Sequence, residues 1–182
     1  MKLDNEGLLD GADFIPSPNF DERPEGVTVD LIVIHNISLP PGEFGGQDVI
    51  DLFTNRLEAS RHPYYANLSG LKVSSHFFVR RNGEIIQFVS TEKRAWHAGL
   101  SCFQGREKCN DFSIGIELEG TDFVPFADEQ YESLANLARA ILRKYPDCSL
   151  AGHSDISPGR KTDPGPFFDW NRFRTAIGNL SY

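Results

Sequence analysis

The run VTVDLIVIHN, from Val27 to Asn36, constrains the fold of this chain more than any other segment. It is rich in β-branched residues and almost continuously apolar, which is typical of a strand whose two faces are both covered. Pro40 and Pro41 follow closely and prevent a regular continuation. We therefore expect a buried strand of an α/β sheet that ends at His35, at the sheet edge where ligands commonly bind.

The remaining segments alternate between strand and helix patterns. They are a hairpin about Asn82–Gly83 within residues 73–90, a strand over 112–120, a helix from an N-cap at Asp128 to about Tyr145, a short strand SLAGH ending at His153, and a last helix from near Asp169. This alternation predicts an α/β fold: a single domain over residues 1–182, with a central mixed β-sheet covered by helices.

Three stretches lack a clear period. Residues 1–26 are expected to form an N-terminal loop region, and residues 91–112 an irregular loop. Residues 37–70 form an insertion with a short helix at about Gln47–Leu57. Because long irregular segments often cover sites, we expect this insertion to act as a lid.

Composition restricts the partners and the compartment. The net charge of −8 argues against nucleic acid and anionic membranes as partners, since both are polyanions. No apolar run approaches the ~20 residues that span a bilayer. The first residues, MKLDNEGLLDGADF, have no apolar core of a signal peptide, so we expect a cytoplasmic protein. Cys102, Cys109 and Cys148 are then expected to be thiols, with a Cys102–Cys109 disulfide as the alternative.

His35 and His153 are candidate metal ligands, because each ends an apolar strand that would point it into a cleft. Asp163 lies in the following loop, which three prolines stiffen. Two imidazoles and a carboxylate leave one zinc position for water, as in catalytic sites. The alternative is a pair of strand-end histidines satisfied by hydrogen bonds. Spacing alone slightly favours that alternative, since no compact HExxH motif is present.

Glu117 and Glu119 share one face of the 112–120 strand, and a carboxylate in an apolar setting is a candidate general base. An edge strand with solvated glutamates is equally supported. Lys161 could supply positive charge to an oxyanion, and Trp96 could stack on a sugar, although each signal is weak by itself. His76 is expected to be a hydrogen-bonded core residue, and His62 a loop residue.

Five blocks, taken in order, carry a resemblance to a known family. They are IVIHNISLPPGEFGG, VSSHFFVRRNGEIIQFV, KRAWHAG, FQGREKCNDFSIGIELEGTD and AGHSDISPGRKTDPGPFFDW. Together they resemble the zinc-dependent N-acetylmuramoyl-L-alanine amidases, and most closely the AmpD-type branch that processes 1,6-anhydro-muropeptides in cell-wall recycling. The resemblance runs from about Pro16 to Phe173.

The resemblance implies a role for each matching residue. It places one Zn²⁺ per chain on His35, His153 and Asp163, and catalysis on Glu117 and Lys161. Matching substrate-binding positions are Asn36, Ala95 and Trp96, together with Lys72 and Lys108, where the family pattern leads us to expect arginine. Lysine keeps the charge but loses the bidentate fork, and Arg106 is the expected compensation.

The expected function is therefore hydrolysis of the amide between N-acetylmuramic acid and L-alanine, on a small muropeptide, by a monomer. Two alternatives come from related proteins. One is a zinc-free peptidoglycan-binding module, as among the peptidoglycan recognition proteins, and the other is a phage-type endolysin that attacks intact wall. A carbohydrate- or partner-binding structural domain is the third alternative, and it leaves the three candidate ligands unexplained.

Overall fold

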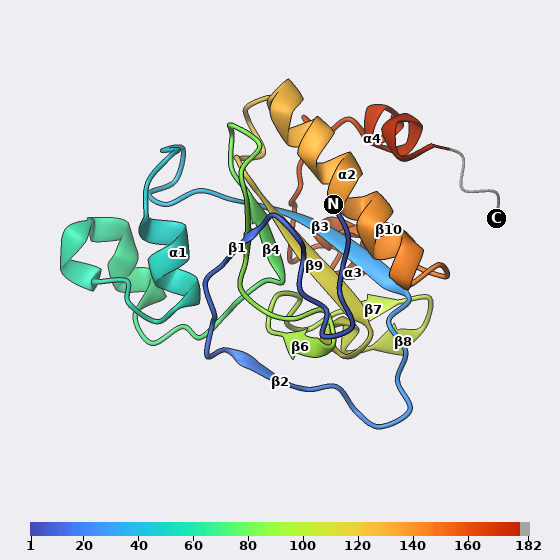
Figure 1. Cartoon of the computed structure of the whole chain (residues 1–182). Helices are drawn as coiled ribbons and strands as arrows, with labels where there is room; N and C mark the ends of the chain where they lie inside the picture. Colours follow the sequence, from blue (N-terminus) through green and yellow to red (C-terminus); the bar gives the residue numbers. More distant parts are fainter. Residues whose placement is uncertain (179–182) are drawn as a thin grey trace.

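A computed structural model describes residues 1–178 and places the predicted buried strand inside a mixed sheet (Figure 1). The strand order is β1-β5-β4-β9-β3-β10. The bounds are β1 Asp13–Phe14, β3 Leu31–Ile37, β4 Phe77–Val79, β5 Ile85–Gln87, β9 Ser113–Glu119 and β10 Ser149–Gly152. β3 pairs in parallel with β9 and β10, β9 pairs in parallel with β4, and β4 and β5 form the predicted antiparallel hairpin. The predicted fold class is confirmed.

The β3 strand begins at Leu31, four residues later than predicted. Its two neighbours set this start, because Leu31 pairs with Ser113 of β9 on one side and with Ser149 of β10 on the other. Neither neighbouring strand extends further back, so residues 27–30 have no ladder to join. The apolar pattern alone could not show where the partners begin.

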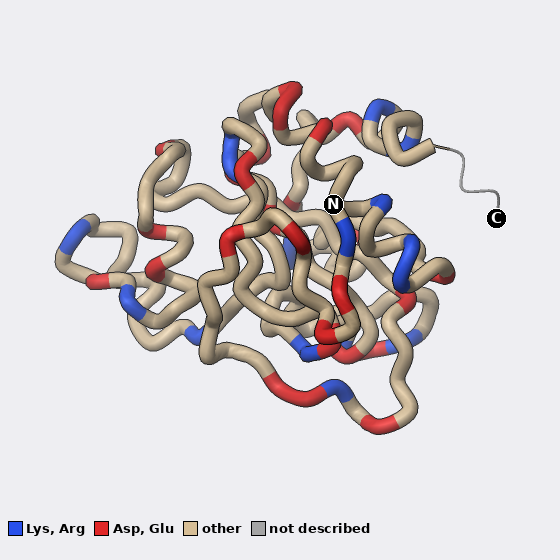
Figure 2. Tube along the Cα trace, viewed as in Figure 1, with Lys and Arg blue, Asp and Glu red and all other residues tan. Residues whose placement is uncertain are grey.

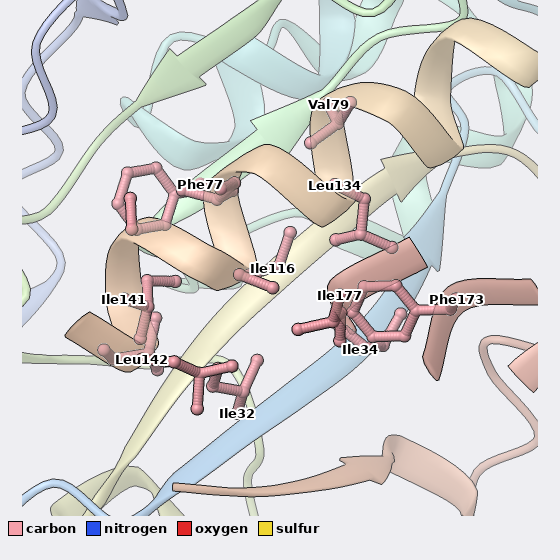
Figure 3. Packing of buried hydrophobic residues seen from close by; sticks show 14 of the residues in the cluster. Ile32, Ile34, Phe77, Val79, Ile116, Leu134, Ile141, Leu142, Phe173 and Ile177 are labelled. Atoms are coloured by element: carbon pink, nitrogen blue, oxygen red, sulfur yellow. The ribbon is translucent and has the colours of Figure 1, made fainter. Parts of the chain in front are cut away.

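One face of the sheet packs against the helices α2 Asp128–Lys144 and α4 Trp170–Ile177 (Figures 1 and 3). The sheet contributes alternate positions of β3 and β9, and the helices contribute large apolar residues: Ile32, Ile34, Ile114, Ile116, Leu118, Leu134, Ile141, Phe173 and Ile177. Burying each such side chain contributes about 1.5–3 kcal/mol, so this layer supplies much of the folding free energy.

The opposite face carries two smaller apolar clusters. The first joins α1 Asp48–Phe53 to Phe78 of β4 and Ile86 of β5. The second joins Leu31 and Val33 of β3 to Ala98, Cys109, Phe112 and Ile156. The side chains of His35 and Glu117 belong to this second face, because Ile34 and Ile116 pack in the cluster on the first. The candidate site therefore lies on the face that α2 does not cover.

The two stretches predicted to be loops contain short strands. β2 Phe20–Glu22 pairs with β6 Lys93–Ala95, and β1 joins the central sheet. Residues 91–112 also hold β7 Cys102–Phe103, β8 Arg106–Glu107 and the 3₁₀ turn η3 Cys109–Asp111. Strands of two or three residues have too few alternating positions to show a period. The partners of β1, β2 and β6 also lie far away in sequence, whereas β7 and β8 pair with each other. The prediction of unbroken loops was wrong for that reason.

Smaller differences concern the ends of elements and the cysteines. The helix predicted at Gln47–Leu57 is shorter, because Asn55 adopts a left-handed conformation with φ of 59°, and the 3₁₀ turns η1 Ala59–Arg61 and η2 Pro63–Leu68 follow. The N-cap of α2 is Ala127, whose backbone N–H donates to Gln130 Oε1. Cys102 and Cys109 are not joined, so the disulfide alternative is wrong. Within residues 1–178, no helix has the length and apolar character needed to cross a bilayer.

Candidate functional site

Strand register brings three of the predicted residues to one place. His35 of β3 lies directly opposite Glu117 of β9. On the other side of β3, Ile34 pairs with Gly152, the last residue of β10. His153 is thus level with His35, although it opens the short helix α3 His153–Ile156 instead of ending the strand as predicted.

The donor atoms of His35, His153 and Asp163 converge. The Nδ1 atoms of the two histidines are 3.0 Å apart, and each lies 3.0 Å from Asp163 Oδ2. Ligands about 2.0–2.1 Å from a tetrahedral zinc would be about 3.3 Å apart, close to this spacing. Two nitrogens and one carboxylate oxygen also form the donor set of a catalytic zinc site with one open position. The three residues therefore fit a zinc ion.

Electrostatics keep these donors in the forms that bind a cation. Burial lowers the pKa of His35 to about 4, outweighing its hydrogen bond to the Asp163 carboxylate, so the imidazole is neutral at pH 7. Burial by itself would raise the pKa of Asp163. Hydrogen bonds with His153 and His35 outweigh it and hold that pKa below its usual range, so the carboxylate is ionised.

The outer nitrogens of both histidines have partners that sequence reasoning missed. His35 Nε2 lies 2.9 Å from His97 Nδ1, and His153 Nε2 lies 3.0 Å from the carbonyl oxygen of Ala98. A signal for His97 existed in Gly115, since a glycine inside a strand often marks a close approach. A Cβ at Gly115 would lie 2.4 Å from Cγ of His97.

Glu117 is a buried carboxylate beside these donors. The residue is 8 % exposed, and its Oε1 lies 4.0 Å from His35 Nδ1. Its Oε2 has no hydrogen-bond partner among residues 1–178. Burial raises the pKa of Glu117 well above its usual value, the charge of Asp163 raises it further, and Lys161 acts in the opposite direction. Since β9 is flanked by β3 and β4, the alternative of an edge strand with solvated glutamates is wrong.

Glu119, on the same face, is bound within the fold. Its Oε1 accepts from the backbone N–H of Gly45 at 2.5 Å, and its Oε2 accepts from that of Arg81 at 2.9 Å. It thereby ties the 37–70 insertion to the β4–β5 hairpin. Of the two glutamates, Glu117 is the one with a free buried oxygen.

A cleft of about 750 Å³ opens over this centre. Its lining includes Asn36, Trp96, Glu117, His153, Lys161 and Asp163. The Asn36 amide nitrogen donates to Asp122 Oδ1 at 2.7 Å and to the carbonyl oxygen of Pro164 at 3.0 Å. Asp122 and Arg160 also line the cleft, and neither was predicted. Their loop positions carry no periodic signal that would have distinguished them.

Four predicted substrate-binding residues lie outside this lining. Ala95 is fully buried in the cluster beneath α1, and Lys72 lines a smaller neighbouring cavity. Lys108 is exposed and precedes the turn η3. Arg106 binds both carboxylate oxygens of Asp30 and stacks 3.7 Å above the Phe112 ring. Asp30 precedes β3, at the end opposite His35, so the structure does not bring Arg106 to the cleft as its predicted role requires.

Comparison with known proteins agrees with this geometry. A family profile described as N-acetylmuramoyl-L-alanine amidase matches residues 25–166, most of the chain and all of the residues that form the centre. The chain belongs to the N-acetylmuramoyl-L-alanine amidase family. The resemblance stated from the five sequence blocks is confirmed, and so is the predicted amidase class.

Individual members of the amidase family are similar over nearly the full length. The 1,6-anhydro-N-acetylmuramyl-L-alanine amidase AmpD of Escherichia coli K12 is 55% identical over 174 residues, which are 94% of this chain and 95% of that protein. A crystal structure of a selenomethionine AmpD derivative has a TM-score of 0.95 and 54% identity, covering 97% of this chain and 99% of that one.

A more distant amidase structure contains a substrate. It is Escherichia coli AmiD in complex with anhydro-N-acetylmuramic acid-L-Ala-D-gamma-Glu-L-Lys, with a TM-score of 0.61 and 30% identity. The match covers 85% of this chain and 60% of AmiD.

Proposed function

We propose that this chain is a zinc amidase that hydrolyses the bond between 1,6-anhydro-N-acetylmuramic acid and L-alanine in peptidoglycan fragments, in cell-wall recycling. The observation that carries the proposal is the convergence of His35 Nδ1, His153 Nδ1 and Asp163 Oδ2 beside the free oxygen of Glu117. The anhydro sugar is supported by the name of the AmpD relative and by the ligand of the AmiD structure.

A zinc ion held by the three donors would polarise the scissile carbonyl and make an attacking water more acidic. Glu117 accepts the proton of that water and delivers it to the amine of the departing L-alanine. Its raised pKa suits the first step, because it makes the carboxylate a stronger base than an ordinary glutamate. Lys161, exposed at the cleft wall, supplies positive charge where the carbonyl oxygen becomes negative.

Substrate binding follows from the other cleft residues. The N–H groups of the Asn36 amide are used by Asp122 and Pro164, so we assign its Oδ1 as the acceptor for a substrate N–H. The Trp96 indole donates to Asp21 at 2.7 Å, which holds a ring that can stack on the sugar. Arg160 and Lys161 give the cleft positive charge for the acidic peptide. The roles expected for Ala95, Lys72 and Lys108 stay predictions.

The wider setting is also part of the proposal. A net charge of −8, with acidic and basic residues interspersed along the chain (Figure 2), supports a small muropeptide and not a polyanion as the partner. The monomeric state and the cytoplasmic location stay predictions. The lid role of residues 37–70 is supported by Pro41, Gly42 and Tyr64, which line the cleft. Equal amide exchange of this segment with and without zinc and substrate would argue against it.

The proposal is tested with an anhydro-muramyl tripeptide, zinc and a chelator. We expect one bound zinc per chain and release of free peptide, which the chelator stops. His35→Ala and Asp163→Ala should lose the zinc and the activity, whereas His62→Ala, a histidine at the start of η2, should keep both. If the purified native protein contains no zinc, the result would favour the zinc-free peptidoglycan-binding module. Release from intact sacculi, without release from the tripeptide, would favour the endolysin.

A further inference from the structure

Two consecutive residues hold the outer nitrogens of both histidine donors. When a cation occupies the shared centre, Nδ1 of each histidine faces it without a proton, and the proton of the neutral ring resides on Nε2. His35 then donates to His97 Nδ1 at 2.9 Å, and His153 donates to the carbonyl oxygen of Ala98 at 3.0 Å. Arg160 Nη2 donates to the same carbonyl oxygen at 2.7 Å. The His97–Ala98 pair therefore contacts Nε2 of both histidines, on the side of each ring that faces away from the shared centre.

His97 is itself oriented by the sheet. Since its Nδ1 accepts from His35, its proton lies on Nε2, which is 3.0 Å from Oγ of Ser113. Ser113 is fully buried at the start of β9. The ring lies against Gly115 of the same strand, where a Cβ would lie 2.4 Å from Cγ of His97. A side chain at that position would displace the imidazole from His35.

The backbone of the same pair is held by one side chain. Asn110 Oδ1 accepts from the N–H of His97 at 3.2 Å and from the N–H of Ala98 at 2.8 Å. Asn110 is 7 % exposed and lies in the turn η3, next to β9. The amide oxygen thus fixes the position of the His97 ring and of the Ala98 carbonyl together.

We propose that the His97–Ala98 pair, held by Asn110, Ser113 and Gly115, is a positioning unit that presents Nδ1 of both histidines to a divalent cation. This inference rests on the metal site of the proposed function. The pair acts through His35 and His153, so its residues are positioning residues. Partners of this kind typically change metal affinity by about 10–100-fold when they are removed.

His76 provides a matched control, because it is another buried histidine close to His97. Their ring centroids are 5.8 Å apart. Its Nε2 lies 3.0 Å from the carbonyl oxygen of Lys93, and its Nδ1 accepts from the N–H of Gly115 at 3.0 Å. Neither contact involves His35 or His153. Substitution of His76 disturbs the same layer of the fold and leaves the contacts to His35 and His153 in place.

The experiment measures the zinc dissociation constant by competition with a chromogenic chelator, on folded protein at constant pH. His97→Leu removes the acceptor, and His97→Asn keeps an oxygen near the place of Nδ1. We expect about 10–100-fold weaker binding for the leucine variant, and affinity close to that of the wild type for His97→Asn and for the control His76→Gln. In zinc-loaded protein, the ring ¹H–¹⁵N signal of His35 Nε2–H should show a hydrogen-bonded proton in the wild type, and this signal should be lost or shifted in His97→Leu.

A second pair of variants keeps the test decisive if His97→Leu fails to fold. Asn110→Ala loses the oxygen that holds both N–H groups, while Asn110→Asp keeps it, so only the alanine variant should weaken zinc binding. Native zinc affinity and an unchanged His35 Nε2–H signal in folded His97→Leu, or in folded Asn110→Ala, would overturn the inference. Wild-type protein that binds zinc but releases no peptide would refute the proposed function and leave this inference standing.

Discussion

Glu117→Gln should have opposite effects on stability and on activity. Wild-type Glu117 is 8 % exposed, has a buried Oε2 with no hydrogen-bond partner among residues 1–178, and lies near the negative charge of Asp163. Folding therefore disfavours its ionised form, which raises its pKa. Glutamine has the same shape without the charge, so the variant removes this unfavourable burial together with the proton acceptor.

The magnitude follows from burial of a charge whose Oε2 has no partner. A buried group left unsatisfied costs about 1–3 kcal/mol, and more when it is charged, so removing the charge should stabilise metal-free Glu117→Gln by about 1–2 kcal/mol at pH 7.5. For a chain of this size that corresponds to a Tm about 3–6 °C higher. Loss of a general base should lower kcat by about 10²–10⁴-fold.

The sign of the pH dependence provides a further check. An acid whose pKa is raised by folding contributes full stability below its unfolded pKa of about 4.3, and loses it as pH rises. The advantage of Glu117→Gln should therefore be present at pH 7.5 and disappear near pH 4. Thermal unfolding in chelator at both pH values measures it, and peptide release from an anhydro-muramyl tripeptide in the presence of zinc measures the activity.

Glu119→Gln is the matched control, because that carboxylate is buried but satisfied by the N–H groups of Gly45 and Arg81. The NH₂ group of the glutamine would face one of these backbone N–H groups, and two donors cannot bond to each other. This variant should therefore lose stability. A lower Tm of Glu117→Gln at pH 7.5, or retained activity, would refute the reasoning about Glu117.

Three further predictions concern the core and the surface. Burial and the Arg23 charge lower the pKa of His76 to about 3, against about 6.5 unfolded, so protonation favours the unfolded chain. This group should reduce the free energy of unfolding by about 2 kcal/mol from pH 7 to 5 in urea titrations, and His76→Gln should lack that contribution. Ile116→Ala, at a fully buried position, should cost about 2–5 kcal/mol by the same measurement. Arg106→Ala should leave kcat/KM unchanged, because its guanidinium binds Asp30, and should cost under about 1 kcal/mol.

Local patterns in the sequence were sufficient for the main elements. The apolar run to His35 predicted a strand covered on both faces, and the helical spacing after Asp128 predicted α2, because each follows from the repeat of a single element. Asn82–Gly83 predicted the β4–β5 hairpin for the same local reason. The three donors were suggested by residue type and position, and the family blocks made them a specific site.

Tertiary structure alone decided how these parts form a site. Parallel pairing places His35 opposite Glu117, 82 positions along the chain, and no local repeat encodes that register. In the folded chain Glu119 accepts a hydrogen bond from the backbone of Gly45, whereas Oε2 of Glu117 has no partner among the described residues, although both side chains share one face of β9. Tertiary packing also places His97 against Nε2 of His35, and it places Arg106 beside Asp30, at the end of β3 opposite His35. The physical reason is common to all of these: they depend on contacts between distant segments, whereas the sequence by itself determines the periodicity of each segment.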